Sequence, residues 1–159
     1  MAGERKKYRC ILFVILTVAW MTVIFLFSAQ NADESSSTSG RIGRLIGHVL
    51  VSGFDDMSAT EQAEFIEMVE YPVRKTAHAT EYAILVVLIF NATGILSDKI
   101  RYIAAWGGAV VYAFTDEIHQ LFVAGRSGQF TDVCIDALGA LVAVVLCWII
   151  GRRKHVQKL

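Results

Sequence analysis

Apolar residues gather in four blocks along the chain, and polar segments separate these blocks. The blocks occupy residues 10–29, 73–96, 102–122 and 131–150. Each is roughly 20 residues long, the length that a helix needs to cross the hydrocarbon core of a bilayer. The connections between the last three blocks are short, so successive helices should run antiparallel. The pattern predicts an all-α, polytopic membrane protein with four antiparallel transmembrane helices in a single domain, residues 1–159.

The first block follows a short basic segment, as the apolar core of a signal peptide does. It is longer, however, than the roughly 7–15 residues of such a core. It also contains the bulky Trp20 and Phe25 instead of tapering to a small-residue cleavage site. We therefore interpret residues 10–29 as a retained transmembrane helix.

The connection at residues 31–73 is the only long one. Its Ser-rich stretch, residues 35–40, has little to bury and is predicted to be a flexible linker. Residues 41–51 place apolar side chains at helical spacing, and a capping box at residues 58–61 begins a second short helix. Both are predicted to be amphipathic helices that lie on the membrane surface or fold over the bundle. Ordinary surface packing and a role as a lid are the two alternatives for them. Pro72 suits the first turn of the second spanning helix.

Composition and charge placement support a membrane location and give it an orientation. The chain is 55% hydrophobic with a mean hydropathy of +0.49, whereas its formal net charge is zero. Ten lysine and arginine residues lie in the segments on the side of the two termini, and five lie on the other side. By the positive-inside rule, both termini are predicted to be cytoplasmic.

Ionisable side chains interrupt the apolar blocks near one end of the predicted bundle. A charge at the centre of a bilayer costs at least about 2.5–3.5 kcal/mol, so such residues normally have partners or a task. They lie at the outer ends of the last three helices and in the turn between the last two. The polar residues concerned are Arg74, Lys75, His78, Glu81, Tyr82, Asp116, Glu117, His119, Gln120, Arg126, Asp132 and Asp136.

Helical periodicity places these residues on one face of each helix, and in a bundle these faces are expected to point toward one another. Arg74, His78 and Glu81 stand at positions i, i+4 and i+7, which places them on one face of a helix. The matching stripes are Tyr112, Asp116 and His119 on the third helix, and Asp132, Asp136, Gly139 and Ala143 on the fourth. The small residues of the last stripe allow close approach of another helix. The sequence therefore predicts a polar pocket between the helices, open or nearly open to the outside.

The residue types in this pocket predict two kinds of role. Clustered carboxylates and imidazoles suit general acid–base chemistry or proton carriage. The predicted catalytic residues are His78, Glu81, Asp116, His119 and Asp136. Cations at the start of a helix oppose its macrodipole, which indicates a negative partner from the other helices or a bound anion. The predicted ligand-binding residues are Arg74, Lys75, Tyr82, Glu117, Gln120, Arg126 and Asp132.

A metal or cofactor site is an alternative interpretation of these residues. The acids and imidazoles would make an acceptable zinc or manganese set, but the adjacent Arg74 and Lys75 disfavour a further cation. The three cysteines, at positions 10, 134 and 147, show no paired spacing, and we interpret them as buried apolar residues. Signatures of phosphate, dinucleotide and nucleophile-elbow sites are absent. We predict no metal, no cofactor and no nucleic-acid partner.

A purely structural role is the main alternative for individual residues. Membrane bundles use polar side chains to join helices, and Gln120 and Tyr82 suit such hydrogen bonding. Glu117 lies about 100° around the helix from Asp116, so it is expected to face a surface helix instead of the pocket.

Three linked motifs resemble the VanZ-like family. They read Arg74-Lys75-x-x-His78-x-x-Glu81-Tyr82, Asp116-Glu117-x-His119-Gln120 and Gly125-Arg126-Ser-Gly-x-x-x-Asp132-x-x-x-Asp136-x-x-Gly139. The likeness covers residues 15–145 and includes the Ser-Ala-Gln ending of the first helix; Ala124 departs from the proline that the family often has. The family is named for an accessory protein of teicoplanin resistance in Gram-positive bacteria. The resemblance implies a bacterial plasma membrane, an envelope setting and reduced teicoplanin susceptibility, but no mechanism.

The expected function is binding or modification of an envelope lipid, a lipid-linked wall precursor or an amphiphilic glycopeptide antibiotic. A proton- or ion-coupled carrier is one alternative, and it requires polar residues toward the inner leaflet. Residues 84–90 and 141–149 are almost wholly apolar, which disfavours a carrier. A structural interaction module without chemistry is the other alternative.

Overall fold

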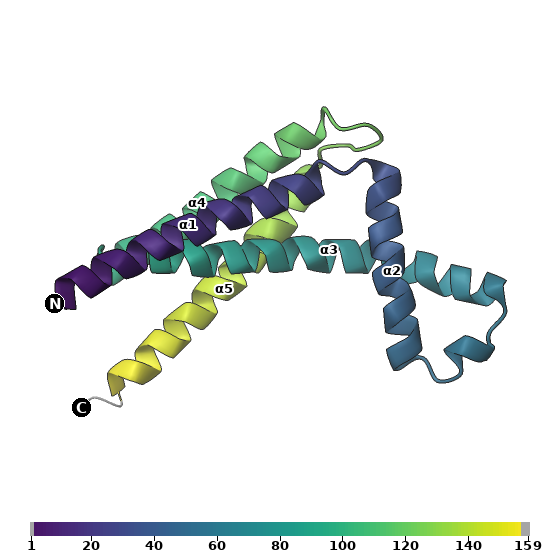
Figure 1. Ribbon diagram of the computed structural model, residues 1–159, viewed down its shortest axis with the longest axis horizontal. Coiled ribbons are helices and arrows are strands. Elements are labelled where there is room, and N and C mark those ends of the chain that lie inside the picture. Colours follow the sequence, from purple (N-terminus) through teal and green to yellow (C-terminus); the bar gives the residue numbers. More distant parts are fainter. Residues whose placement is uncertain (1, 157–159) are drawn as a thin grey trace.

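The computed structural model describes residues 2–156 of the 159-residue chain. Its elements are α1 (Ala2–Ser28), α2 (Ala32–Leu50), the 3-10 helix η1 (Phe54–Asp56), α3 (Ala59–Ala92), α4 (Asp98–Gln120) and α5 (Phe130–Val156). The described part of the chain contains no strand, which confirms the all-α class. The two chain ends lie at one end of the bundle, and the α1–α2 and α4–α5 connections lie at the other (Figure 1).

Helix α3 is the centre of the fold, because it packs against α1, α2, α4 and α5 (Figure 1). Its direction relative to α1 follows from two contacts. The Arg9 guanidinium donates to Asn91 Oδ1 at 2.8 Å, and the Trp20 indole N–H donates to the Glu81 carbonyl at 2.9 Å. The later residues of α1 therefore meet the earlier residues of α3, so the two helices run antiparallel, as predicted.

Two helices in the described residues, α1 and α5, are long and apolar enough to cross a membrane. They leave large side chains uncovered, as Ile15 and Val142 show with 60% and 59% of their surface exposed. An apolar surface of this extent fits lipid rather than water. Helices α3 and α4 do not meet the same standard of length and composition, so the four spans stay a prediction.

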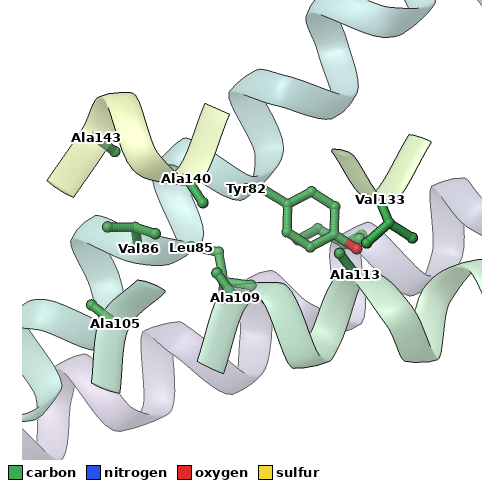
Figure 2. Close-up of a cluster of buried hydrophobic side chains, with 10 residues drawn as sticks. Tyr82, Leu85, Val86, Ala105, Ala109, Ala113, Val133, Ala140 and Ala143 are labelled. Carbon is green, nitrogen blue, oxygen red and sulfur yellow. The ribbon is translucent and has the colours of Figure 1, made fainter. Parts of the chain in front are cut away.

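Small side chains bring α3, α4 and α5 close together. Three alanines, Ala105, Ala109 and Ala113, form a fully buried stripe on α4. Tyr82 of α3 reaches between Ala113 of this stripe and Val133 of α5 (Figure 2). A Cβ atom on Gly139 of α5 would lie only 2.2 Å from the Ala79 carbonyl of α3. The predicted close approach at the small-residue stripe is confirmed.

The prediction of a flexible linker at residues 35–40 is wrong, because these residues lie inside α2. Asn31 caps this helix: its side chain accepts from the Glu34 N–H at 2.9 Å, and Glu34 accepts from the Asn31 N–H at 3.1 Å. The buried residues of α2 are small and recur every fourth position: Ser35, Ser39, Gly43 and Gly47. This stripe packs α2 against α3, so packing overrides the low helix propensity of serine and glycine.

The predicted helix start near Pro72 is also wrong, because α3 is one helix of 34 residues. The predicted capping box at Ser58 is confirmed, but the helix that it begins continues through the proline instead of ending before it. Helix α2 contacts both sides of this point. A Cβ on Gly43 would meet Val69, and Ser36 accepts from Arg74 at 3.4 Å. We attribute the continuity to this packing, because proline removes one helical hydrogen bond.

Candidate functional site: a polar cavity between four helices

A cavity of about 260 Å³ lies at the end of the bundle opposite the chain termini. Helices α1, α2, α3 and α4 and the α4–α5 turn contribute to its wall. Its ionisable lining residues are Arg74, His78 and Glu81 from α3, Asp116 from α4 and Arg126 from the turn. The predicted stripe on α3 therefore faces one space, in which it meets groups from two other segments. Ser28, at the end of α1, and Gln30, just after it, line the same space.

Hydroxyl groups from α2 complete the wall, although they were not among the predicted site residues. Ser35, Thr38 and Ser39 line the cavity. They belong to the Ser-rich stretch interpreted as a linker. The repeat of small residues at every fourth position was the signal that could have identified a packed helix there.

Charge is graded along the cavity. Arg74 begins the α3 stripe and Arg126 lies in the α4–α5 turn, so both belong to the end of the bundle with the α1–α2 and α4–α5 connections. Glu81 follows Arg74 by seven residues, a separation of about 10 Å along the helix axis. Asp116 lies four residues before the end of α4. The cations therefore lie toward these connections, which we call the mouth of the cavity, and Glu81 and Asp116 lie farther from them.

Two cations have carboxylate partners. Lys75 Nζ lies 2.5 Å from Asp132 Oδ1, and both side chains are largely buried. Arg74 pairs with Glu70, one turn earlier on α3. The expectation that a carboxylate from another helix faces these cations is confirmed for Lys75. Glu70 was missed, since the helix was expected to begin after it.

The two most completely buried carboxylates have no hydrogen-bond partner among the described residues. Asp136 is completely buried, and its Oδ1 lies 3.8 Å from His78 Nδ1, beyond ordinary hydrogen-bond length. Asp116 is 3% exposed, and the hydroxyls of Ser28 and Tyr82 lie near it without hydrogen-bond geometry. Burying polar groups without partners is costly, and native proteins keep few of them. Their concentration around one cavity identifies it as the candidate site.

Asp136 does not line the cavity itself. It lies behind His78, whose side chain does line the wall. This arrangement makes His78 the group that can touch a ligand. Asp136 lies beside the imidazole of His78, on the side away from the cavity.

Other predicted residues lie outside the cavity wall. Glu117 accepts from the Gln129 backbone N–H at 2.7 Å, so it holds the α4–α5 turn instead of the expected surface helix. His119 packs against the Phe25 ring, with 4.5 Å between ring centroids. Seven predicted site residues do not line the cavity: Lys75, Tyr82, Glu117, His119, Gln120, Asp132 and Asp136.

Arg126 joins the two loops at the mouth. Its Nε donates to the Gln30 carbonyl at 3.1 Å, and nearby the Ala32 N–H donates to the Ala124 carbonyl at 3.3 Å. Gly125 adopts a φ of 72°, a conformation that favours glycine, and it packs against Ala32. Burial lowers the pKa of Arg126, and the neighbouring Arg74 lowers it further.

No group of three or more His, Cys, Asp or Glu side chains in residues 3–153 is arranged to hold a metal ion. The three cysteines are free thiols, and only Cys10 is buried. The prediction that they act as buried apolar residues is therefore wrong for Cys134, which is exposed, and holds only partly for Cys147.

Comparison with protein-family models matches the family described as VanZ/LLP1 over residues 13–151, nearly the whole chain. The chain belongs to the VanZ family. This family is associated with glycopeptide resistance, and membership together with the two apolar helices indicates a membrane protein. Comparisons with curated proteins and with solved structures found no match.

Each of the three VanZ-like motifs supplies part of the cavity wall. The first gives the α3 stripe, the second gives Asp116 and the third gives Arg126. The third motif also supplies Asp132 and Asp136, which face Lys75 and His78. The motifs are far apart in the sequence, and the fold brings them to one end of the bundle.

Proposed function

We propose that this VanZ-family protein binds the anionic head group of an envelope lipid or of a lipid-linked wall precursor in the polar cavity. The observation that carries the proposal is the charge gradient. Guanidiniums lie at the mouth, and unpartnered acids and an imidazole lie deeper. Guanidinium groups bind phosphate through paired hydrogen bonds, and a phosphate is the common anionic group of membrane lipids.

The proposal includes a four-span topology with both termini in the cytoplasm of a bacterial cell. Ten basic residues against five support this orientation through the positive-inside rule. The cavity then opens in the outer leaflet, where envelope precursors and glycopeptide antibiotics are found. Binding a wall precursor or the antibiotic at this site would lower susceptibility to teicoplanin-type drugs.

Proton transfer to the bound group is the chemical part of the proposal. His78 lines the cavity with Asp136 behind it, and Glu81 and Asp116 provide carboxyl groups on the same wall. Imidazole and carboxyl groups in this arrangement are suited to general acid–base catalysis. Arg126 and Arg74 would hold the charged part of the ligand while these deeper groups act on it.

A carrier is less well supported. Toward the chain termini from Tyr82, the bundle is closed by Leu85, Val86 and Ala109, all completely buried (Figure 2). This apolar packing offers no polar groups for a proton or an ion on the way to the other leaflet.

Native mass spectrometry of the purified protein tests the head-group proposal. Wild-type protein should retain phosphatidic acid in preference to phosphatidylcholine with the same chains. Arg126→Gln should abolish this preference, because it removes the cation that joins the mouth loops. Arg44→Gln is the matched control, since Arg44 is exposed on α2 outside the cavity. Equal retention of both lipids by the wild type would refute the proposal.

Teicoplanin susceptibility tests the same site in cells. At matched protein level, Asp116→Asn and His78→Gln should remove any protection that the wild type gives, whereas Arg44→Gln should keep it. Unchanged protection in both cavity variants would contradict a role of these groups.

A further inference from the structure

A second hollow, mostly apolar, adjoins the polar cavity. It is a groove of about 580 Å³ between α1, α2 and α3. Its wall includes the side chains of Trp20, Ile42, Ile46, Val69, Val73 and Ile84. Glu81 is the only ionisable residue in its lining. The groove is thus more than twice as large as the polar cavity and has one ionisable residue in its wall, whereas the cavity has five.

The two hollows lie next to each other along α3. Ile42, Val73, Ala77 and Glu81 line both of them. The Trp20 indole donates to the Glu81 carbonyl and so ties α1 to α3 at this boundary. A single molecule can therefore place a polar part in the cavity and an apolar part in the groove.

The size of the groove suits a hydrocarbon chain. Its lining on α3 runs from Val69 to Ile84, and the part from Val73, at the level of the mouth, to Ile84 covers about 16 Å of helix. Half of a bilayer's hydrocarbon core is about 15 Å thick. The groove is therefore long enough for a chain that spans one leaflet.

The charge of the mouth indicates which amphiphile occupies the groove. Arg126 makes one hydrogen bond, through Nε, to a protein acceptor in the described residues. Its remaining N–H donors can bind an acceptor on a ligand. We propose that the groove holds a hydrocarbon chain of an anionic membrane lipid whose head group fills the polar cavity, an assignment that rests on the proposed function.

The groove controls the route of the lipid more than its affinity. A lipid chain gains little free energy when it leaves the bilayer for an equally apolar groove. The head group, in contrast, moves sideways from the leaflet into the cavity without passing through water. The chain's position is therefore the quantity to measure.

Photo-crosslinking of the full-length protein in phosphatidylcholine vesicles measures that position. One probe is phosphatidic acid with a diazirine on one chain, and the other is phosphatidylcholine with the same chain. The phosphatidic acid probe should label groove residues of α2 and α3, and unlabelled phosphatidic acid should suppress this labelling. The phosphatidylcholine probe should label the lipid-facing sides of α1 and α5.

Two neighbouring positions on α2 give a matched pair of variants. Ile46 lines the groove, whereas Leu45 does not line it and is 62% exposed. Ile46→Trp should fill the groove and reduce labelling to the level of the phosphatidylcholine probe, whereas Leu45→Trp should leave labelling unchanged. Thr80→Phe fills the groove from α3 and serves if Ile46→Trp does not fold.

The outcomes separate this inference from the proposed function. If phosphatidic acid is retained in native mass spectra but both probes label the same surfaces, the groove assignment is wrong and head-group binding stands. Equal, uncompeted labelling of the groove by both probes also overturns the assignment. If phosphatidic acid is not retained, the proposed function itself fails.

Discussion

The two ends of the bundle treat polar groups differently. At the end that carries the chain termini, Arg9 donates to Asn91, and Arg101 donates to Asp98 and to the Phe90 carbonyl. At the other end, buried atoms of His78 and Asp116, among others, have no partner in the described residues. The same α-helices α3 and α4 reach both ends. Unsatisfied polar groups are therefore a property of one place and not of the fold.

Burial alone does not explain the difference. Lys75 and Asp132 are largely buried at the polar end, yet they form a close ion pair. One turn further along the same two helices, His78 and Asp136 stand 3.8 Å apart. The first two residues form an ion pair without a ligand, whereas the second two leave polar atoms without a hydrogen-bond partner. We therefore expect substitutions in the two pairs to affect stability with opposite sign.

Breaking the complete pair should have the largest effect. Lys75→Met leaves the Asp132 carboxylate buried and alone, which should lower the free energy of unfolding by roughly 3–5 kcal/mol. Thermal unfolding in detergent, followed by size-exclusion profiles, measures this loss. The double variant Lys75→Met with Asp132→Leu should recover most of it. A single variant as stable as the wild type would show that the ion pair is not structural.

Inserting a methyl group between the closely packed helices α3 and α5 should have the next largest effect on stability. Gly139→Ala places a methyl group 2.2 Å from a backbone carbonyl, so the helices must separate, at a cost of about 1–3 kcal/mol. Gly107→Ala is the control, because a Cβ there meets nothing within 4 Å. Equal unfolding temperatures for the two variants would mean that the close approach does not occur in the membrane.

Replacing a buried side chain that has no hydrogen-bond partner should not destabilise the fold. Asp136→Asn should leave the free energy of unfolding unchanged or raise it by about 1 kcal/mol, since an unpartnered buried carboxylate is costly. Protection against teicoplanin should nevertheless fall, because His78 loses the carboxyl group beside it. A loss of stability as large as that of Lys75→Met would place Asp136 among the structural ion pairs.

The smallest effect is expected at the opposite end of the bundle. Arg9→Gln removes an exposed hydrogen bond to Asn91 and should change stability by less than about 0.5 kcal/mol. Retention of phosphatidic acid should match the wild type. A change in lipid preference would show that the terminal end also belongs to the binding site.

The polar stripes were predictable because helical periodicity is a local property. Arg74, His78 and Glu81 share a face in any straight helix, and a bundle turns such a face inward. The facing stripe on α5 was predictable for the same reason, and Lys75 does meet Asp132. The position of Asp136 behind His78, outside the cavity wall, depends on how the helices rotate against one another, which spacing alone does not determine.

The rest depended on packing between distant segments. The serines of α2 have low helix propensity, and Pro72 normally marks a helix start, so both were interpreted as interruptions. The close fit of α2 against α3 overrides both tendencies. Glu70 and the hydroxyl wall of the cavity were lost from the prediction as a result. His119 was misplaced: it shares a stripe with Asp116, but it packs against Phe25 of α1 and does not line the cavity.

The hydrogen bond between Ala32 and Ala124 has a practical consequence for topology mapping. An epitope inserted in either of the connections that it joins would disturb both, and with them the placement of Arg126. The turn at Gly53 is exposed, and a Cβ there would meet only the Asp56 carboxylate, at 3.9 Å. Tags placed beside Gly53 should report which side of the membrane this end of the protein faces while leaving the cavity intact.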